Sequence, residues 1–198
     1  DKPDRSLSFG APGDTPLWAD FNGDGKNVPG LYRNGRWLIS SHADGIADVE
    51  IDFGGERGDV PLVGDIDGDG KADLVIFRSG TWIVRGSRNP TQAFELYFGA
   101  SGDIPLLADF DGDGKLDLVV YRAGSWFVDT HRDGKATITL AFGGERNDRP
   151  LAFKWNADGN AAPILFRDGE WLVSSARDGK ISTKLSFGTS GDIPVAIT

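Results

Sequence analysis

The sequence contains no cysteine and no methionine, and only two of its 198 residues are histidine. Without cysteine there is no disulfide framework and no thiol nucleophile. No histidine cluster has the spacing of a zinc site, and no Gly-x-Ser-x-Gly elbow of a serine hydrolase occurs. A paired-carboxylate glycosidase stays open, because its two carboxylates come from distant parts of a chain and leave no local pattern. The residues therefore identify no catalytic site.

Basic residues are also scarce: 21 Lys and Arg stand against 30 Asp and Glu, giving a formal net charge of -9. This balance argues against a nucleic-acid partner, which needs clustered basic side chains. No apolar run approaches the roughly 18 residues of a membrane span, so we expect no membrane insertion. The chain starts at Asp1 and not at Met, which is typical of a processed or trimmed product.

Glycine and proline are abundant, with 28 Gly and 10 Pro, and they indicate many tight turns. A Phe-Gly pair recurs at 9, 53, 98, 142 and 187, in steps of 44 or 45 residues. A repeat of this length is typical of propellers and solenoids. Each unit holds four short runs typical of β-strands, bounded by Gly, Pro, Asn or Asp, and no helical periodicity. The sequence therefore predicts an all-β fold, a β-propeller of four-stranded antiparallel blades.

The repeats divide the chain into four complete units of about 45 residues, with a partial strand at each end. We expect a single domain over 1–198, with repeats at about 9–52, 53–97, 98–141 and 142–186 and partial strands at 1–8 and 187–198. Three closures stay open: a four-bladed ring, a five-bladed ring completed by the two ends, and a fragment of a larger propeller.

Two units carry an acidic loop after their first strand, DIDGDGKAD at 65–73 and DFDGDGKLD at 109–117. Alternating Asp side chains on a tight turn can point at one hard cation, and six to eight oxygen ligands suit Ca²⁺. The twelfth position, which is Glu in an EF-hand, is Ile76 or Val120, so these are β-type calcium loops closed by their ninth residue. The predicted ligands are Asp65, Asp67, Asp69, the Lys71 carbonyl and Asp73, and then Asp109, Asp111, Asp113, the Lys115 carbonyl and Asp117.

The other two loops are degraded. In the first unit Asp20, Asn22 and Asp24 remain but Val28 replaces the closing Asp, so we expect a weaker third site. In the fourth unit Lys154 replaces the first Asp, and we expect no metal. We hypothesise that the Lys154 ammonium replaces the cation by pairing with Asp158.

The motif Phe98-Gly99, Gly102-Asp103 and DFDGDGKLDLVV, repeated over the chain, resembles the FG-GAP/VCBS repeats of integrin-type β-propellers. Where integrin repeats carry Gly-Ala-Pro, this chain has Tyr-Arg or Phe-Arg followed by x-Gly-x-Trp, and in this it is similar to the repeats of bacterial secreted proteins. The resemblance implies a propeller with Ca²⁺ between the first and second strands. Family members include adhesion proteins, lectins and modules of secreted enzymes, so the fold does not fix the function.

A Trp beside an Arg can stack on a sugar, and repeated copies would add avidity. The alternative is that Trp packs between blades while Arg caps a hairpin, which presence in every unit favours. Two further tryptophans do not follow the repeat. The candidate ligand-binding residues are Arg33 and Trp37, Arg78 and Trp82, Arg122 and Trp126, Arg167 and Trp171, with the irregular Trp18 and Trp155.

Extracellular calcium loops often bind at about 10⁻⁴–10⁻³ M and would be empty in cytosol, so we expect a secreted or cell-surface protein. The lead hypothesis is a non-catalytic module that binds glycans or an extracellular protein. The alternatives are a glycoside hydrolase or polysaccharide lyase, and a structural or adhesion domain of a larger secreted protein.

Overall fold

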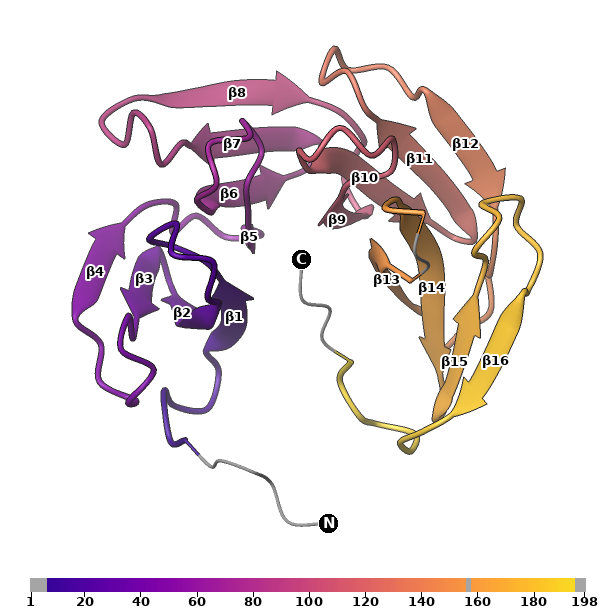
Figure 1. Cartoon of the computed structure of the whole chain (residues 1–198), viewed down its shortest axis with the longest axis horizontal. Helices are drawn as coiled ribbons and strands as arrows, with labels where there is room; N and C mark the ends of the chain where they lie inside the picture. Colours follow the sequence, from indigo (N-terminus) through magenta and orange to yellow (C-terminus); the bar gives the residue numbers. More distant parts are fainter. Residues whose placement is uncertain (1–6, 156–157, 195–198) are drawn as a thin grey trace.

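The computed structural model describes residues 7–155 and 158–194, which form strands, turns and loops. The strands make four antiparallel sheets, and within each sheet they lie in sequence order. The sheets are arranged around a common axis with the first strand of each innermost, as in a β-propeller (Figure 1). The predicted fold class is confirmed. Since the described residues contain no helix, they include none that could cross a membrane.

Each of the four predicted repeats contains one sheet, which we call a blade. Blade one holds β1 (Thr15–Ala19), β2 (Val28–Arg33), β3 (Arg36–Ile39) and β4 (Val49–Asp52). Blade two holds β5 (Val60–Gly64), β6 (Asp73–Arg78), β7 (Thr81–Arg85) and β8 (Ala93–Tyr97). Blade three holds β9 (Ile104–Ala108), β10 (Asp117–Arg122), β11 (Ser125–Asp129) and β12 (Ile138–Ala141). Blade four holds β13 (Arg149–Lys154), β14 (Ala161–Arg167), β15 (Glu170–Val173) and β16 (Thr183–Ser186).

The turn between the second and third strands of each blade has two residues with positive φ. In blade three these are Ala123 (φ 45°) and Gly124 (φ 91°). Two positive φ values make the tight turn whose twist matches that of a β-hairpin. The turn sets the register, so that Tyr121 lies opposite Trp126, with ring centroids 5.3 Å apart.

Apolar side chains fill the spaces between consecutive blades. The second strand is buried on both faces in every blade, as its continuous apolar sequence predicts. Trp82 and Trp126, on the third strands of blades two and three, are 0% exposed. Each lies in a cluster with residues of the following blade, such as Val120 for Trp82 and Leu165 for Trp126. The core is therefore a series of layers between neighbouring sheets.

The inner strands touch in chain order, β1 with β5, β5 with β9, and β9 with β13. Among the described residues β13 and β1 have no contact of similar extent, and Figure 1 shows the four sheets as an arc open between the first and the last. Residues 7–8 and 187–194, the described parts of the segments predicted to hold a partial strand at each end, are not in strands. No described strand pairs with them. The rest of both predicted strands falls outside the described residues.

Candidate metal centres and axial cavity

The loop of blade two folds around the side chain of its first aspartate. The Asp65 carboxylate accepts hydrogen bonds from the backbone N–H groups of Gly68 (2.6 Å) and Gly70 (2.8 Å). Gly68 has a φ of +79°, and a Cβ there would lie 2.9 Å from the Lys115 side chain of the next blade. The positive φ of the turn therefore favours glycine at this position, and the Lys115 side chain lies directly against it.

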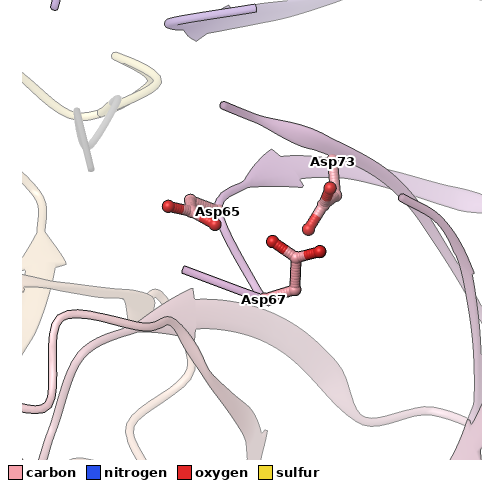
Figure 2. A group of neighbouring side chains, drawn as sticks. All are labelled: Asp65, Asp67 and Asp73. Carbon is pink, nitrogen blue, oxygen red and sulfur yellow. The ribbon is translucent and has the colours of Figure 1, made fainter. Parts of the chain in front are cut away.

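Three carboxylates of this loop gather around one point. Asp65, Asp67 and Asp73 each offer an oxygen, and these atoms lie within 4.8 Å of one another. Figure 2 shows the carboxyl groups of Asp67 and Asp73 turned toward each other, with Asp65 beside them. The fourth predicted ligand, Asp69, instead accepts a hydrogen bond from the Ser87 hydroxyl at 2.7 Å. The structure thus brings together three of the four predicted carboxylates.

The loop of blade three forms a second such group, with a different membership. Here Asp109, Asp111 and Asp113 offer oxygens within 4.8 Å of one another. The closing Asp117 is buried, and its Oδ2 accepts a hydrogen bond from the Phe110 N–H at 2.8 Å. These are the acidic groups of this kind among the residues that the structure describes.

Asp117 provides the test of whether the residues fit a cation. Its side chain is 0% exposed, and its Oδ1 has no hydrogen-bond partner. Burial, with smaller contributions from the nearby Asp111 and Asp109 carboxylates, raises the pKa of Asp117 to about 7. A buried carboxylate oxygen without a partner is costly, and a hard cation bound by oxygen would satisfy it. Both the donor set and this orphan oxygen fit Ca²⁺.

The predicted carbonyl ligands stay predictions. Lys71 and Lys115 hold their place through their N–H groups, which donate to Asp69 Oδ1 (2.9 Å) and Asp113 Oδ1 (2.8 Å). In blade one Asp20 keeps the turn, since it accepts from the Gly23 N–H at 2.7 Å, and the Asn22 amide donates to Asp24 at 3.3 Å. The weaker third site therefore has the turn but only two carboxylates.

The hypothesis for blade four is wrong. Lys154 Nζ lies 3.1 Å from Asp109 Oδ2 of blade three, while Asp158 pairs with Arg177 at 3.3 Å. The loops touch from blade to blade, so the first residue of one loop reaches the previous loop more easily than the far side of its own. Backbone hydrogen bonds also join the loops of consecutive blades. In each, an N–H group at the end of one loop donates to the carbonyl of the first residue of the previous loop: Ala72 to Asp20 (2.8 Å), Leu116 to Asp65 (3.0 Å) and Ala161 to Asp109 (2.6 Å).

Sequence reasoning missed three arginines in the turns between third and fourth strands. Arg88 lies 3.8 Å from Asp69, Arg132 lies 3.9 Å from Asp117, and Arg177 pairs with Asp158, each within its own blade. Their recurrence at matching places in three repeats is the signal that could have identified them. They place positive charge beside each acidic loop of blades two to four.

A cavity of about 330 Å³ lies where the ends of the four inner strands meet. Its lining includes the first residue of each loop: Asp20, Asp65, Asp109 and Lys154. Lys71 and the apolar side chains of Leu116, Phe153 and several alanines complete it. The cavity is therefore lined by both charged and apolar residues, with three aspartates and two lysines among them.

The repeated Arg and Trp side chains are engaged in the scaffold. Each of the four repeated arginines donates from Nε to the aspartate of the turn that precedes the first strand of its blade. The indole N–H of each of the four repeated tryptophans donates to the carbonyl of the phenylalanine in the next Phe-Gly pair. The pairs are Arg33–Asp14, Arg78–Asp59, Arg122–Asp103 and Arg167–Asp148 (2.6–2.7 Å), and Trp37–Phe53, Trp82–Phe98, Trp126–Phe142 and Trp171–Phe187 (2.8–3.0 Å). These contacts support the packing interpretation.

The two irregular tryptophans lie apart. Trp18, on β1, is 38% exposed, whereas Leu107 at the matching place of blade three is buried between blades. Trp155 packs on Phe153, with ring centroids 6.1 Å apart, beside the apolar cluster of blade four. Neither tryptophan lines the axial cavity.

Residues 65–120 match the model of the FG-GAP-like repeat family, and they include both complete acidic loops. No curated protein matches the chain. Three solved structures share the fold at low identity. The first is a lectin of Agrocybe aegerita described as recognising non-reducing terminal N-acetylglucosamine, with 18% identity, a TM-score of 0.58, and 87% of this chain and 51% of that chain covered.

The second is the Tc holotoxin pore of Photorhabdus luminescens, with 16% identity, a TM-score of 0.56, and 84% of this chain and 9% of that chain covered. The third is BBS1N in complex with ARL6DN, with 11% identity, a TM-score of 0.50, and 94% and 59% covered. The chain thus spans about half the length of the lectin and less than two thirds of the other two. The family match at residues 65–120 therefore lies within a β-propeller, from the loop of blade two to β10 of blade three.

Proposed function

We propose that this chain is a secreted, calcium-binding β-propeller that acts as a non-catalytic binding module for glycans. The axial cavity is the observation that carries the proposal. The aspartates and lysines of its lining can accept from and donate to sugar hydroxyls, and its apolar side chains suit the C–H faces of a sugar ring. The lectin among the structural neighbours supports a glycan as the ligand class.

Calcium has a structural part in this proposal. Asp65, Asp67 and Asp73 in blade two, and Asp109, Asp111, Asp113 and Asp117 in blade three, would hold the ions. Bound Ca²⁺ supplies the positive charge that lets several carboxylates share one loop. Because Asp65 and Asp109 also line the cavity, the ions would fix two of its polar groups.

The proposal is tested with a glycan array probed by the labelled protein in millimolar Ca²⁺ and again in EGTA. We expect binding to one sugar class that chelation abolishes. Asn27→Trp places a large side chain in the cavity wall and should abolish the same signal, whereas Gln92→Trp, on an exposed turn of blade two, should not. Absence of binding from protein shown by melting to be folded would refute the glycan assignment. An extracellular protein partner would then be the next ligand class to test.

A further inference from the structure

The outward face of blade four is built like an interface between blades but is uncovered. We define the open face as Trp171 and Leu185 of blade four with Phe187, Gly188, Asp192 and Ile193 of the segment that follows it. Phe187 is 77% exposed, while the matching Phe98 and Phe142 are buried. Trp171 is partly exposed, in contrast to the fully buried Trp82 and Trp126.

The glycine of each Phe-Gly pair shows what normally covers this face. A Cβ on Gly99 would lie 2.8 Å from Val120 Cγ1, and one on Gly143 would lie 2.6 Å from Leu165 Cδ1. In both cases the apolar side chain belongs to the second strand of the following blade, two residues before its arginine. At Gly188 the nearest groups are Asp192 and Phe166, and within the described part of the chain no apolar side chain of a further second strand takes the place of Val120 or Leu165.

Asp192 differs from the equivalent aspartates of the four blades in its charged partner. The turn before it is formed, since Thr189 N–H donates to Asp192 Oδ2 at 2.8 Å, as Ala100 N–H does to Asp103. In the four blades this aspartate binds an arginine of the second strand through Nε. Among residues 7–155 and 158–194, Asp192 forms no ion pair with an arginine. The carboxylate is therefore in place for a guanidinium that this region does not provide.

The backbone after Asp192 also has no paired strand among the described residues, unlike the equivalent backbone of blade three. Ile104 begins β9, which pairs with β10 from Asp117 to Tyr121. Ile193, at the matching place, is 77% exposed and is not in a strand. A strand added beside it would pair with its backbone groups, as in recognition by β-augmentation.

The geometry points to a docking site on the open face for a β-hairpin whose first strand ends in apolar–aromatic–arginine. The chain's own second strands define this chemistry: they end in Leu-Tyr-Arg, Ile-Phe-Arg, Val-Tyr-Arg and Leu-Phe-Arg. The arginine binds Asp192, the apolar residue covers Gly188 and Phe187, and the strand lies beside the backbone at Ile193. The partner is a hairpin of a second, different polypeptide, and the site is separate from the axial cavity.

The test uses a synthetic peptide with the sequence of residues 116–130, which contains β10, the turn and β11, with lysines added at its carboxyl end for solubility. Binding to the whole chain is measured by calorimetry. We expect binding that weakens at least tenfold when the peptide carries Arg122→Ala, and to the same degree when the chain carries Asp192→Asn. The matched chain variant Asp178→Asn, an exposed aspartate of blade four, should leave it unchanged.

A peptide that binds equally well to the parent chain and to Asp192→Asn would overturn the proposal. So would a peptide that does not bind while the chain sediments as a dimer that Phe187→Asp dissociates, since a second copy would then cover the face. These outcomes are independent of the glycan array, which reports on the axial cavity.

Discussion

Blades three and four have the same strand order and the same two-residue turn between the second and third strands. They differ in the loop after the first strand and in how their outward faces are covered. Blade three begins its loop with Asp109 and closes it with the buried Asp117, whereas blade four has Lys154 and Ala162 there. Blade three is covered on both faces, while the outward face of blade four, with Phe187 exposed, is not. The contact between their loops, Ala161 N–H to the Asp109 carbonyl, is nevertheless formed. The two repeats therefore share a backbone conformation, while the charge of the loop and the exposure of the outward face differ between them.

The largest expected difference concerns the two tryptophans. Trp126→Ala removes a side chain that is 0% exposed and should lower the free energy of unfolding by about 4 kcal/mol. Trp171→Ala removes a partly exposed side chain and should cost about 2 kcal/mol, since less apolar area returns to water. Urea unfolding of both variants measures this. Equal losses would show that the outward face of blade four is covered in solution.

The second difference concerns the aspartates of the Gly-Asp-x-Pro turns. Asp103→Asn removes a buried carboxylate that accepts two hydrogen bonds from Arg122 (2.6 and 2.7 Å), and it should cost about 2 kcal/mol. Asp192→Asn, where no arginine is bound among the described residues, should change stability by less than about 0.5 kcal/mol. Denaturant titration of both variants decides. A large loss from Asp192→Asn would show that this carboxylate has an arginine partner in solution.

The same ion pairs predict how stability depends on acid. Hydrogen bonds from Arg33 lower the pKa of Asp14 to about 2, and those from Arg122 lower the pKa of Asp103 below its ordinary 3.8. Because the folded state holds these carboxylates ionised, their contribution is full above about pH 4 and is lost as the pH falls toward 2. Unfolding measured from pH 7 to 2 should show this loss, and Asp103→Asn should show less of it. An identical acid profile in that variant would contradict the role of the pair.

The smallest effect concerns the lysine between the two loops. The Lys154 ammonium, 3.1 Å from Asp109 Oδ2, opposes a cation in the blade-three loop. Lys154→Met should therefore tighten Ca²⁺ binding there by roughly three- to tenfold, about 1 kcal/mol. Lys184→Met is the matched control, because Lys184 pairs with Glu170 on the outer strands of blade four. Calcium titrations of both variants test this, and equal affinities would show that Lys154 leaves the site when the ion binds.

The fold could be predicted from the sequence because its signals are local and repeated. The Phe-Gly pair occurs five times, the two-residue turn four times and the complete acidic loop twice, and each of these signals acts over a short stretch of chain. The end strands could not be predicted in the same way. A β-strand needs a hydrogen-bonding neighbour, and Ile193 and Pro194, which match the start of a first strand, are not in a strand.

The candidate site was predicted less completely, for a related reason. Spacing identifies which aspartates share a loop but not which of them turn elsewhere. Asp69 binds Ser87 from a turn 18 residues away, and Lys154 binds a carboxylate of the previous blade. The arginines at 88 and 132 reach the loops from a separate hairpin. These contacts depend on how the turns of one blade, and the loops of two blades, lie in space.

Counting the calcium ions bound by the chain tests the central claim most directly. Isothermal titration should give two Ca²⁺ per chain, with a weaker third from the loop at Asp20. Asp67→Ala and Asp111→Ala should each remove one of the two, and the double variant should remove both. Binding that these substitutions leave unchanged, or no binding to folded protein, would contradict the account.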